Sequence, residues 1–310
     1  MAGHFVALEG GDRVPSRSRI LLTALGRLLF AAVILVGSIA AYRLIVHPLI
    51  ESTLSLGDHA SSIVRRVDIF AVVVLSYWAF VRYSERRRAE ELSFPWGRFV
   101  LAAGAGSLSI GVTILALYAT GHYELVSFRG FGQVFDILGQ IWIAAVLEEV
   151  AFRGILFRIL EEATGTRAAL AASALIFSVA HIANNGFGGV TLLSVTLAGL
   201  MWAGVFIVWR NIWVVAAHHC CWNATIFLIG VPLSGQDWQD RAPLVTASHG
   251  SALWTGGAFG PEDSLVNLVI CGAICAALWR LARRSGRVRG IDAAADRDAA
   301  IAPREGDPTA

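Results

Sequence analysis

Residues 188–209 read GGVTLLSVTLAGLMWAGVFIVW and contain no charged side chain. The hydrocarbon core of a bilayer is roughly 30 Å thick, and an α-helix needs about 20 apolar residues to cross it. This stretch therefore predicts a membrane-spanning helix. The rest of the chain has to be compatible with a protein that lies in a bilayer.

Seven further apolar runs lie on either side of this stretch. They cover about 20–45, 64–83, 98–120, 137–160, 167–183, 212–230 and 264–281. Only 15% of the 310 residues are charged, whereas soluble proteins carry about a quarter. We therefore expect an all-α, polytopic transmembrane bundle of about eight helices. The run at 64–83 is the weakest, because charged residues lie near its start, and the run at 167–183 is short.

All 25 basic residues are arginines, and they cluster at the ends of the apolar runs. This placement does not support nucleic-acid binding, and it indicates orientation, because cytoplasmic loops are enriched in positive charge. Eight spans would put most of the arginines on one side. We therefore expect a multi-pass protein of a bacterial cytoplasmic membrane with both termini in the cytoplasm. The first apolar run is longer than a usual signal-peptide core, so we expect it to be retained.

The polar tails, residues 1–17 and 285–310, are rich in Ala, Asp, Arg and Pro. We expect them to be disordered and to flank one transmembrane domain, residues 18–284. The long loop at about 231–263 falls on the non-cytoplasmic side, where its tryptophans would lie at the membrane interface.

The four cysteines lie inside apolar runs rather than in loops, where a disulfide framework would place them. They are Cys220, Cys221, Cys271 and Cys275. We expect them to be reduced and buried, with metal binding through thiolates as the minor alternative.

Ionisable residues inside membrane spans are costly and usually mark function. Glu148, Glu149 and Arg153 lie in the middle of the run at 137–160. Glu149 and Arg153 are four residues apart, so they share a helix face and can pair, while Glu148 points about 100° away. The arginine would keep Glu149 charged and leave Glu148 as a candidate general base. A structural ion-pair network is the alternative.

Two further polar positions share this pattern. His181 follows Phe177 by one turn, and His219 and Asn223 share a face of the run at 212–230, with His218 turned away. Taken alone, His181 would more often be a helix-end histidine bonded to a carbonyl, and the second pair could be polar glue between helices. The helical rise places all these groups roughly 13–21 Å from the arginine-marked ends. We therefore expect them to meet in one polar site near mid-membrane.

These groups are the parts needed to hydrolyse an amide. Glu148 would deprotonate a water molecule. His181 and His219 would either bind a divalent metal with Glu148 or orient the water and the tetrahedral intermediate. Asn223 would donate a hydrogen bond to the developing oxyanion.

The three segments resemble the CPBP family of intramembrane endopeptidases (CAAX-protease, bacteriocin-processing and lysostaphin-resistance-like proteins). Its motifs are Glu-Glu-x-x-x-Arg, Phe-x-x-x-His and His-x-x-x-Asn, in that order. The resemblance spans about 85–281, with a core at about 135–281, and includes the loop segment from Trp254 to Glu262. It implies that Glu148 activates the water, that Glu149 and Arg153 support it, and that His181, His219 and Asn223 complete the site.

The resemblance also implies a water-accessible chamber that opens towards the cytoplasm. It leaves the cofactor open: Glu148, His181 and His219 would suit an open zinc site, or another divalent metal, and equally a metal-free glutamate mechanism. We therefore predict an intramembrane endopeptidase acting on a membrane-anchored protein or peptide. The alternatives are a proton-coupled transporter, since buried Glu and His also form proton relays, and a non-catalytic membrane adaptor.

Overall fold

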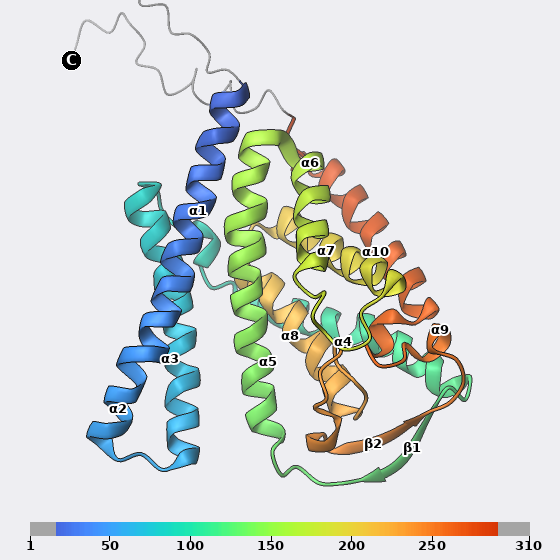
Figure 1. Ribbon diagram of the computed structural model, residues 1–310. Coiled ribbons are helices and arrows are strands. Elements are labelled where there is room, and N and C mark those ends of the chain that lie inside the picture. Colours follow the sequence, from blue (N-terminus) through green and yellow to red (C-terminus); the bar gives the residue numbers. More distant parts are fainter. Residues whose placement is uncertain (1–16, 291–310) are drawn as a thin grey trace, which may run out of the picture.

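The computed structural model describes residues 17–290, and this part of the chain is built almost entirely of helices (Figure 1), as predicted. The expected disorder of the two tails falls on residues 1–16 and 291–310, which lie outside the described residues. Each of the eight apolar runs corresponds to a helix or to part of one.

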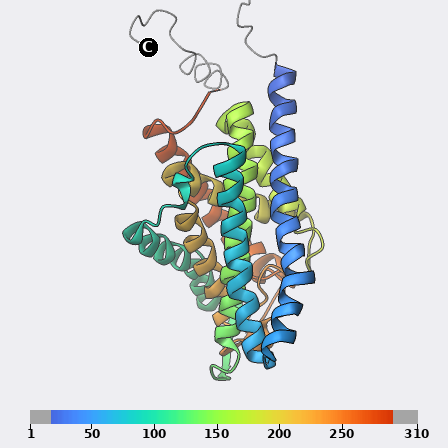
Figure 2. The same cartoon turned by 90° about the vertical axis from the view of Figure 1, so that its left-hand side faces the viewer.

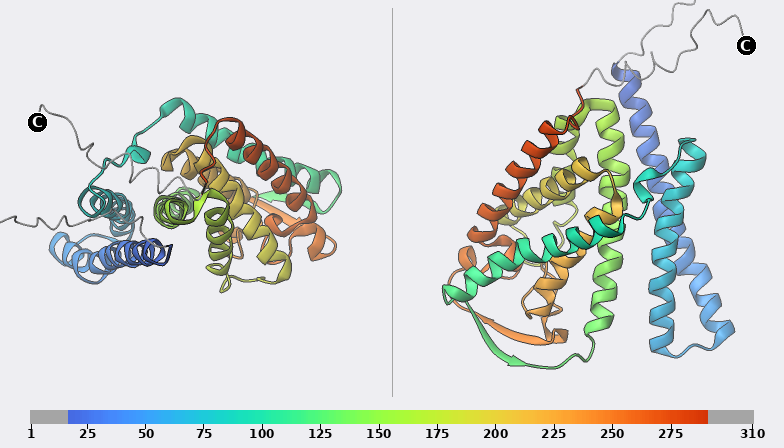
Figure 3. Two further views of the ribbon diagram at one scale, coloured as in Figure 1. Left: turned by 90° about the horizontal axis from the view of Figure 1, so that it is seen from above. Right: turned by 180° about the vertical axis from the view of Figure 1, so that it is seen from behind.

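A pair of long helices lies to one side of the bundle (Figure 3). Helix α1 (Arg17–Ala41) continues through a π-helical turn (Tyr42–Val46) into α2 (His47–Leu54), and α3 (Asp58–Ala79) returns beside them (Figure 2). Two of the charged residues near the start of α3 are bound within the protein. Arg66 pairs at 2.9 Å with Asp136, directly before the predicted run at 137–160, and Asp68 accepts a hydrogen bond from the Tyr42 hydroxyl at 3.0 Å. These contacts explain how a weakly apolar run forms a helix.

The helix that carries Glu148 and Glu149 changes its winding directly after them. Helix α5 (Val134–Glu149) runs into a π-helical turn, η4 (Val150–Phe157), and then into α6 (Arg158–Val179). The chain reverses at Gly165, whose φ of 78° is in the left-handed region that glycine adopts without a Cβ clash. The predicted break between the runs at 137–160 and 167–183 therefore occurs at this glycine. Helix α6 ends just before His181.

Four helices complete the bundle around α5 and α6. They are α4 (Trp96–Ala119), α7 (Gly189–Trp209), α8 (Ile212–Leu228) and α10 (Leu265–Arg284). Helix α4 runs obliquely across the back of the molecule and packs along α8 (Figure 3). The two backbones approach closely at Gly106, where a Cβ atom would overlap the backbone carbonyl of His218. Helix α7 is the most buried of the long apolar helices.

Four helical segments within residues 17–290 are long and apolar enough to cross a membrane. They are Ser18–Leu54, Trp96–Ala119, Gly189–Trp209 and Leu265–Arg284. The other predicted runs also form helices, but these are shorter, as α8 is, or carry more charged residues. The chain is thus a membrane protein. Helix α1 begins and α10 ends at the same end of the molecule (Figure 1).

The long loop differs most from the prediction. Strands β1 (Tyr123–Phe128) and β2 (Leu244–Ser248) pair antiparallel at the end of the molecule opposite the start of α1 and the end of α10 (Figure 1). Short helices α9 (Ala252–Thr255) and η6 (Pro261–Asp263) follow β2. Trp238 lines an internal cavity instead of serving only as a surface anchor, whereas Trp254 is 42% exposed.

The cysteines are free, in agreement with the prediction that they are reduced. Only Cys271 is fully buried, and the other three are half-buried.

Candidate active site

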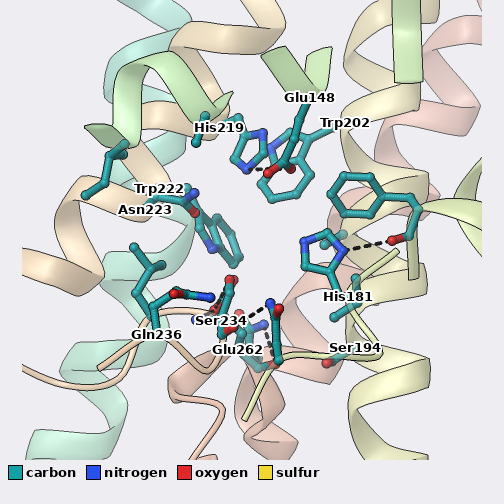
Figure 4. Close-up of a pocket in the computed structure, with 18 of the residues that line it drawn as sticks. Glu148, His181, Ser194, Trp202, His219, Trp222, Asn223, Ser234, Gln236 and Glu262 are labelled. Atoms are coloured by element: carbon teal, nitrogen blue, oxygen red, sulfur yellow. Dashed lines mark hydrogen bonds and ion pairs between the residues drawn. The ribbon is translucent and has the colours of Figure 1, made fainter. Parts of the chain in front are cut away.

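Three distant stretches of the chain meet at one cavity of about 170 Å³. Glu148 reaches it from the end of α5, His181 from the turn after α6, and His219 and Asn223 from α8 (Figure 4). The structure therefore brings together four of the six predicted site residues around a shared space. Glu149 and Arg153 do not line the cavity and lie behind it.

Glu149 and Arg153 form the predicted ion pair, with Nη1 3.0 Å from Oε1 and both side chains buried. The guanidinium also donates from Nη2 to the carbonyl of Gly199 at 3.1 Å, which ties η4 to α7. Its carbon lies 4.7 Å from the centre of the Phe177 ring, a cation–π distance. The guanidinium is thus held by a carboxylate, a carbonyl and an aromatic ring, and Oε1 of Glu149, which it binds, has a second partner.

That partner is His219. Its Nδ1 lies 2.7 Å from Oε1 of Glu149. Since an ionised carboxylate only accepts hydrogen bonds, Nδ1 carries the proton and Nε2 is left for the cavity. The Nε2 atom lies 3.9 Å from Oε2 of Glu148, and the ring stacks on Trp202 at 3.7 Å between centroids. A carboxylate and an indole therefore hold this imidazole in a single orientation.

His181 is bonded to a carbonyl at a helix end and also lines the cavity. Its Nδ1 lies 2.8 Å from the carbonyl oxygen of Phe177, so it is a helix-end histidine bonded to a carbonyl. The same bond places the proton on Nδ1, because a carbonyl only accepts. Its Nε2 is then available to the cavity, which His181 lines.

His218 is turned away from the cavity, as its place in the helix predicts. It is buried, and its Nδ1 accepts a hydrogen bond from Nε1 of Trp202 at 3.2 Å. It does not line the cavity. The two adjacent histidines therefore have different roles.

Buried polar atoms without a partner concentrate at this site. Among the described residues they are Oε2 of Glu148, Oε2 of Glu149, Nε1 of Trp222, Oδ1 of Asn223 and Oε1 of Gln239. Three of these five residues line the cavity, and Glu149 lies directly behind it. Such atoms are rare in folded proteins and call for a functional explanation.

A second group of polar side chains forms the other end of the cavity. Glu262 comes from η6, Asn267 from α10, and Ser234 and Gln236 from a tight turn after α8. Oε2 of Glu262 accepts hydrogen bonds from the backbone N–H of Ser234 at 2.7 Å and from its hydroxyl at 2.8 Å. Burial raises the pKa of the Glu262 carboxyl to about 7, against the lowering effect of these two bonds.

A comparison with known families gives one match, over residues 130–225, to the family described as type II CAAX prenyl endopeptidase Rce1-like. The matched segment resembles this family. It contains all six predicted site residues, and it confirms the family resemblance drawn from the motifs. The match indicates a peptidase of the CAAX-protease kind with a membrane-associated peptide or protein substrate. Neither the curated proteins nor the solved structures include a match to the chain.

The polar end around Glu262 lies outside the Rce1-like segment. In the sequence, Glu262 stands out only as part of a loop segment that resembles the CPBP family, and no role was predicted for it. A signal was available, since two consecutive acids, Glu262 and Asp263, directly precede an apolar run. The contact between Glu149 and His219 was also missed, because it joins residues 70 positions apart.

The three predicted metal ligands, Glu148, His181 and His219, do not lie close enough together to bind one metal ion. Within residues 17–290, no three side chains of His, Cys, Asp or Glu lie close enough to hold a metal ion. Glu148 and His219 are neighbours, but His181 does not complete a ligand group with them. The arrangement as it stands does not fit a zinc ion, and a metal at these residues stays a prediction.

Proposed function

We propose that the chain is an intramembrane endopeptidase that hydrolyses a peptide bond of a membrane-associated protein or peptide with a water molecule activated by Glu148. One observation carries the proposal. Oε2 of Glu148 is buried without a hydrogen-bond partner, faces the cavity, and lies beside an imidazole that Glu149 and Trp202 hold in place. A carboxylate of this kind is suited to take a proton from water.

In the proposed step, Glu148 removes a proton from water while the water oxygen attacks the carbonyl carbon of the substrate. The second O–H bond of the water stays intact and donates a hydrogen bond to Nε2 of His181, which is available because Nδ1 is already bonded to a carbonyl. The carbonyl oxygen becomes an oxyanion. Glu148 then gives its proton to the leaving nitrogen as the C–N bond breaks, and a carboxylic acid and an amine are released.

The oxyanion is stabilised from α8. Asn223 has an amide oxygen without a partner, so its amide group is uncommitted and can turn its N–H towards the oxyanion. His219 supplies a second contact when Nε2 is protonated, with Glu149 supporting the positive charge. One such donor typically contributes about 3–4 kcal/mol to the transition state.

The test compares the cleavage of a quenched-fluorescent peptide that ends in a prenylated CAAX sequence. Purified protein in liposomes is expected to cleave it, and Glu148→Gln is expected to reduce kcat by about a thousandfold or more. Glu162→Gln is the matched control, because Glu162 is a half-buried member of an ion-pair network away from the cavity.

Full activity of Glu148→Gln would contradict the mechanism. Proton flux through the same liposomes that disappears in Glu148→Gln, without any peptide cleavage, would favour the transporter alternative instead.

A further inference from the structure

Four glutamates are fully buried in the described part of the chain. Three of them are paired with an arginine: Glu91 with Arg87, Glu149 with Arg153, and Glu161 with Arg210. The fourth, Glu262, has no basic partner among residues 17–290. A buried carboxylate without a counter-charge is costly. This exception lies at the wall of the cavity.

Glu262 and Glu148 lie at opposite ends of the cavity (Figure 4). Both bonds from Ser234 end on Oε2 of Glu262, so Oε1 is the oxygen that a substrate donor can reach. The Trp222 side chain, which is only 1% exposed, also lines this space. Its N–H favours the charged form of Glu262, but it makes no hydrogen bond of ordinary geometry. The end of the cavity is therefore lined by polar groups, and not all of them have a hydrogen-bond partner.

We propose that this end of the cavity is a specificity subsite that binds a cationic side chain of the substrate, with Glu262 as its counter-ion. The inference rests on the proposed function, since it names the kind of residue that the endopeptidase selects near its cleavage site. A lysine or arginine would give Glu262 the partner that the other three buried glutamates already have. No arginine of the chain lines the cavity within the described residues.

The surroundings of Glu262 suit a basic side chain in shape as well as in charge. Trp222 and Trp238 line the same cavity, and indole rings attract cations. The long apolar stem of lysine or arginine can pass along such rings while its charged group reaches the carboxylate. An acidic side chain would meet two carboxylates, Glu148 and Glu262, in one enclosed space and would be disfavoured.

The subsite is rigid before substrate arrives. Ser234 and Gly235 form a tight turn with φ values of 48° and 76°, bridged between Leu233 and Gln236. Glu262 holds this turn through Ser234, and the Asn184 amide donates to the carbonyl of Ser234 at 2.8 Å. Because the Glu262 carboxyl group is already held in place, binding a ligand does not have to offset the cost of ordering it.

The main test measures a ratio of rates, which cancels any general loss of activity. Quenched-fluorescent peptides, otherwise identical, would carry Lys, Gln, Met or Glu at each position around the scissile bond. In the wild type, one position is expected to favour Lys over Met by about tenfold or more in kcat/KM, with Glu the poorest. In Glu262→Gln, the Lys-to-Met ratio at that position is expected to fall to about one.

Gln236 offers a second pair of variants, because its side chain is exposed, lines the same end of the cavity and leaves the bonds of Glu262 intact. Gln236→Arg is expected to lower the Lys-to-Met ratio and Gln236→Glu to raise it. The inference is overturned if no position favours Lys, if Gln is accepted as well as Lys, or if neither Glu262 nor Gln236 variants change the ratio.

A binding measurement separates this inference from the proposed function. The Lys and Glu peptides would be titrated against Glu148→Gln in detergent micelles by fluorescence anisotropy. If the Lys peptide binds more tightly but the wild type cleaves no peptide, the cationic subsite is supported and the endopeptidase activity is contradicted. If the wild type cleaves the peptides without a preference for charge, the endopeptidase activity is supported and the cationic subsite is contradicted.

Discussion

His218 and His219 are neighbours in α8, and about 100° of helical rotation separates their environments. His219 meets Glu149 and the cavity, whereas His218 accepts a hydrogen bond from Trp202 and stays outside it. The side chain of Trp202 touches both, since its ring stacks on His219 and its N–H binds His218. Variants of the two residues can therefore distinguish an effect on catalysis from an effect on folding stability.

His219→Gln is expected to lower kcat/KM by about a hundredfold or more, because the oxyanion loses a contact and Glu149 loses its partner. His218→Gln removes only a buried partner of the Trp202 N–H, which costs about 1–3 kcal/mol when it is left unsatisfied. It is expected to lower the unfolding temperature while most of the activity remains. Thermal unfolding in detergent and peptide cleavage would be measured on both variants. Equal loss of activity in the two would contradict the assignment.

At the scale of the elements, the helices that carry the site are held by groups outside it. Arg153 of η4, the turn that continues α5, binds α7 through the carbonyl of Gly199. Helix α4 supports α8 from behind, where Gly106 allows the two backbones to touch at His218. Small residues of this kind let membrane helices approach closely. The position of α8, and with it of His219 and Asn223, therefore depends on the packing of α4.

Gly106→Ala is expected to push α4 away from α8, because the added Cβ overlaps a backbone carbonyl that cannot move aside. Overpacking of this kind costs about 1–3 kcal/mol, so the unfolding temperature and the cleavage rate should both fall. Gly104→Ala is the control, since it lies on the same helix and faces open space. If both variants behaved like the wild type, the contact between α4 and α8 would not support the site.

At the scale of the whole molecule, the sequence predicts local geometry better than contacts between distant segments. The Glu149–Arg153 pair and the outward turn of His218 follow from helical periodicity alone, and the structure has both. The contact of Glu149 with His219 depends on how two helices pack. Glu262 belongs to a loop that has no periodicity to place it. The β1–β2 pairing was also not predicted, because the helices α5 to α8 lie between its two strands in the sequence.

The orientation in the membrane is the last property of the whole molecule that the structure makes testable. Helix α1 begins and α10 ends at one end, and the β1–β2 pair lies at the other (Figure 1). Since cytoplasmic ends are enriched in arginine, the end at which α1 begins and α10 ends is expected to face the cytoplasm. Ser285 and Ser248 are exposed at these two ends and can be converted to matched single cysteines.

In a variant whose four native cysteines are replaced, a membrane-impermeant maleimide is expected to label Ser248→Cys in intact cells. It should label Ser285→Cys only after the membrane is broken. The opposite pattern would reverse the orientation and place the β1–β2 pair in the cytoplasm. Because Glu262 lies on the loop that follows this pair and Glu148 faces it across the cavity, the labelling also shows from which side a basic substrate residue would approach its subsite.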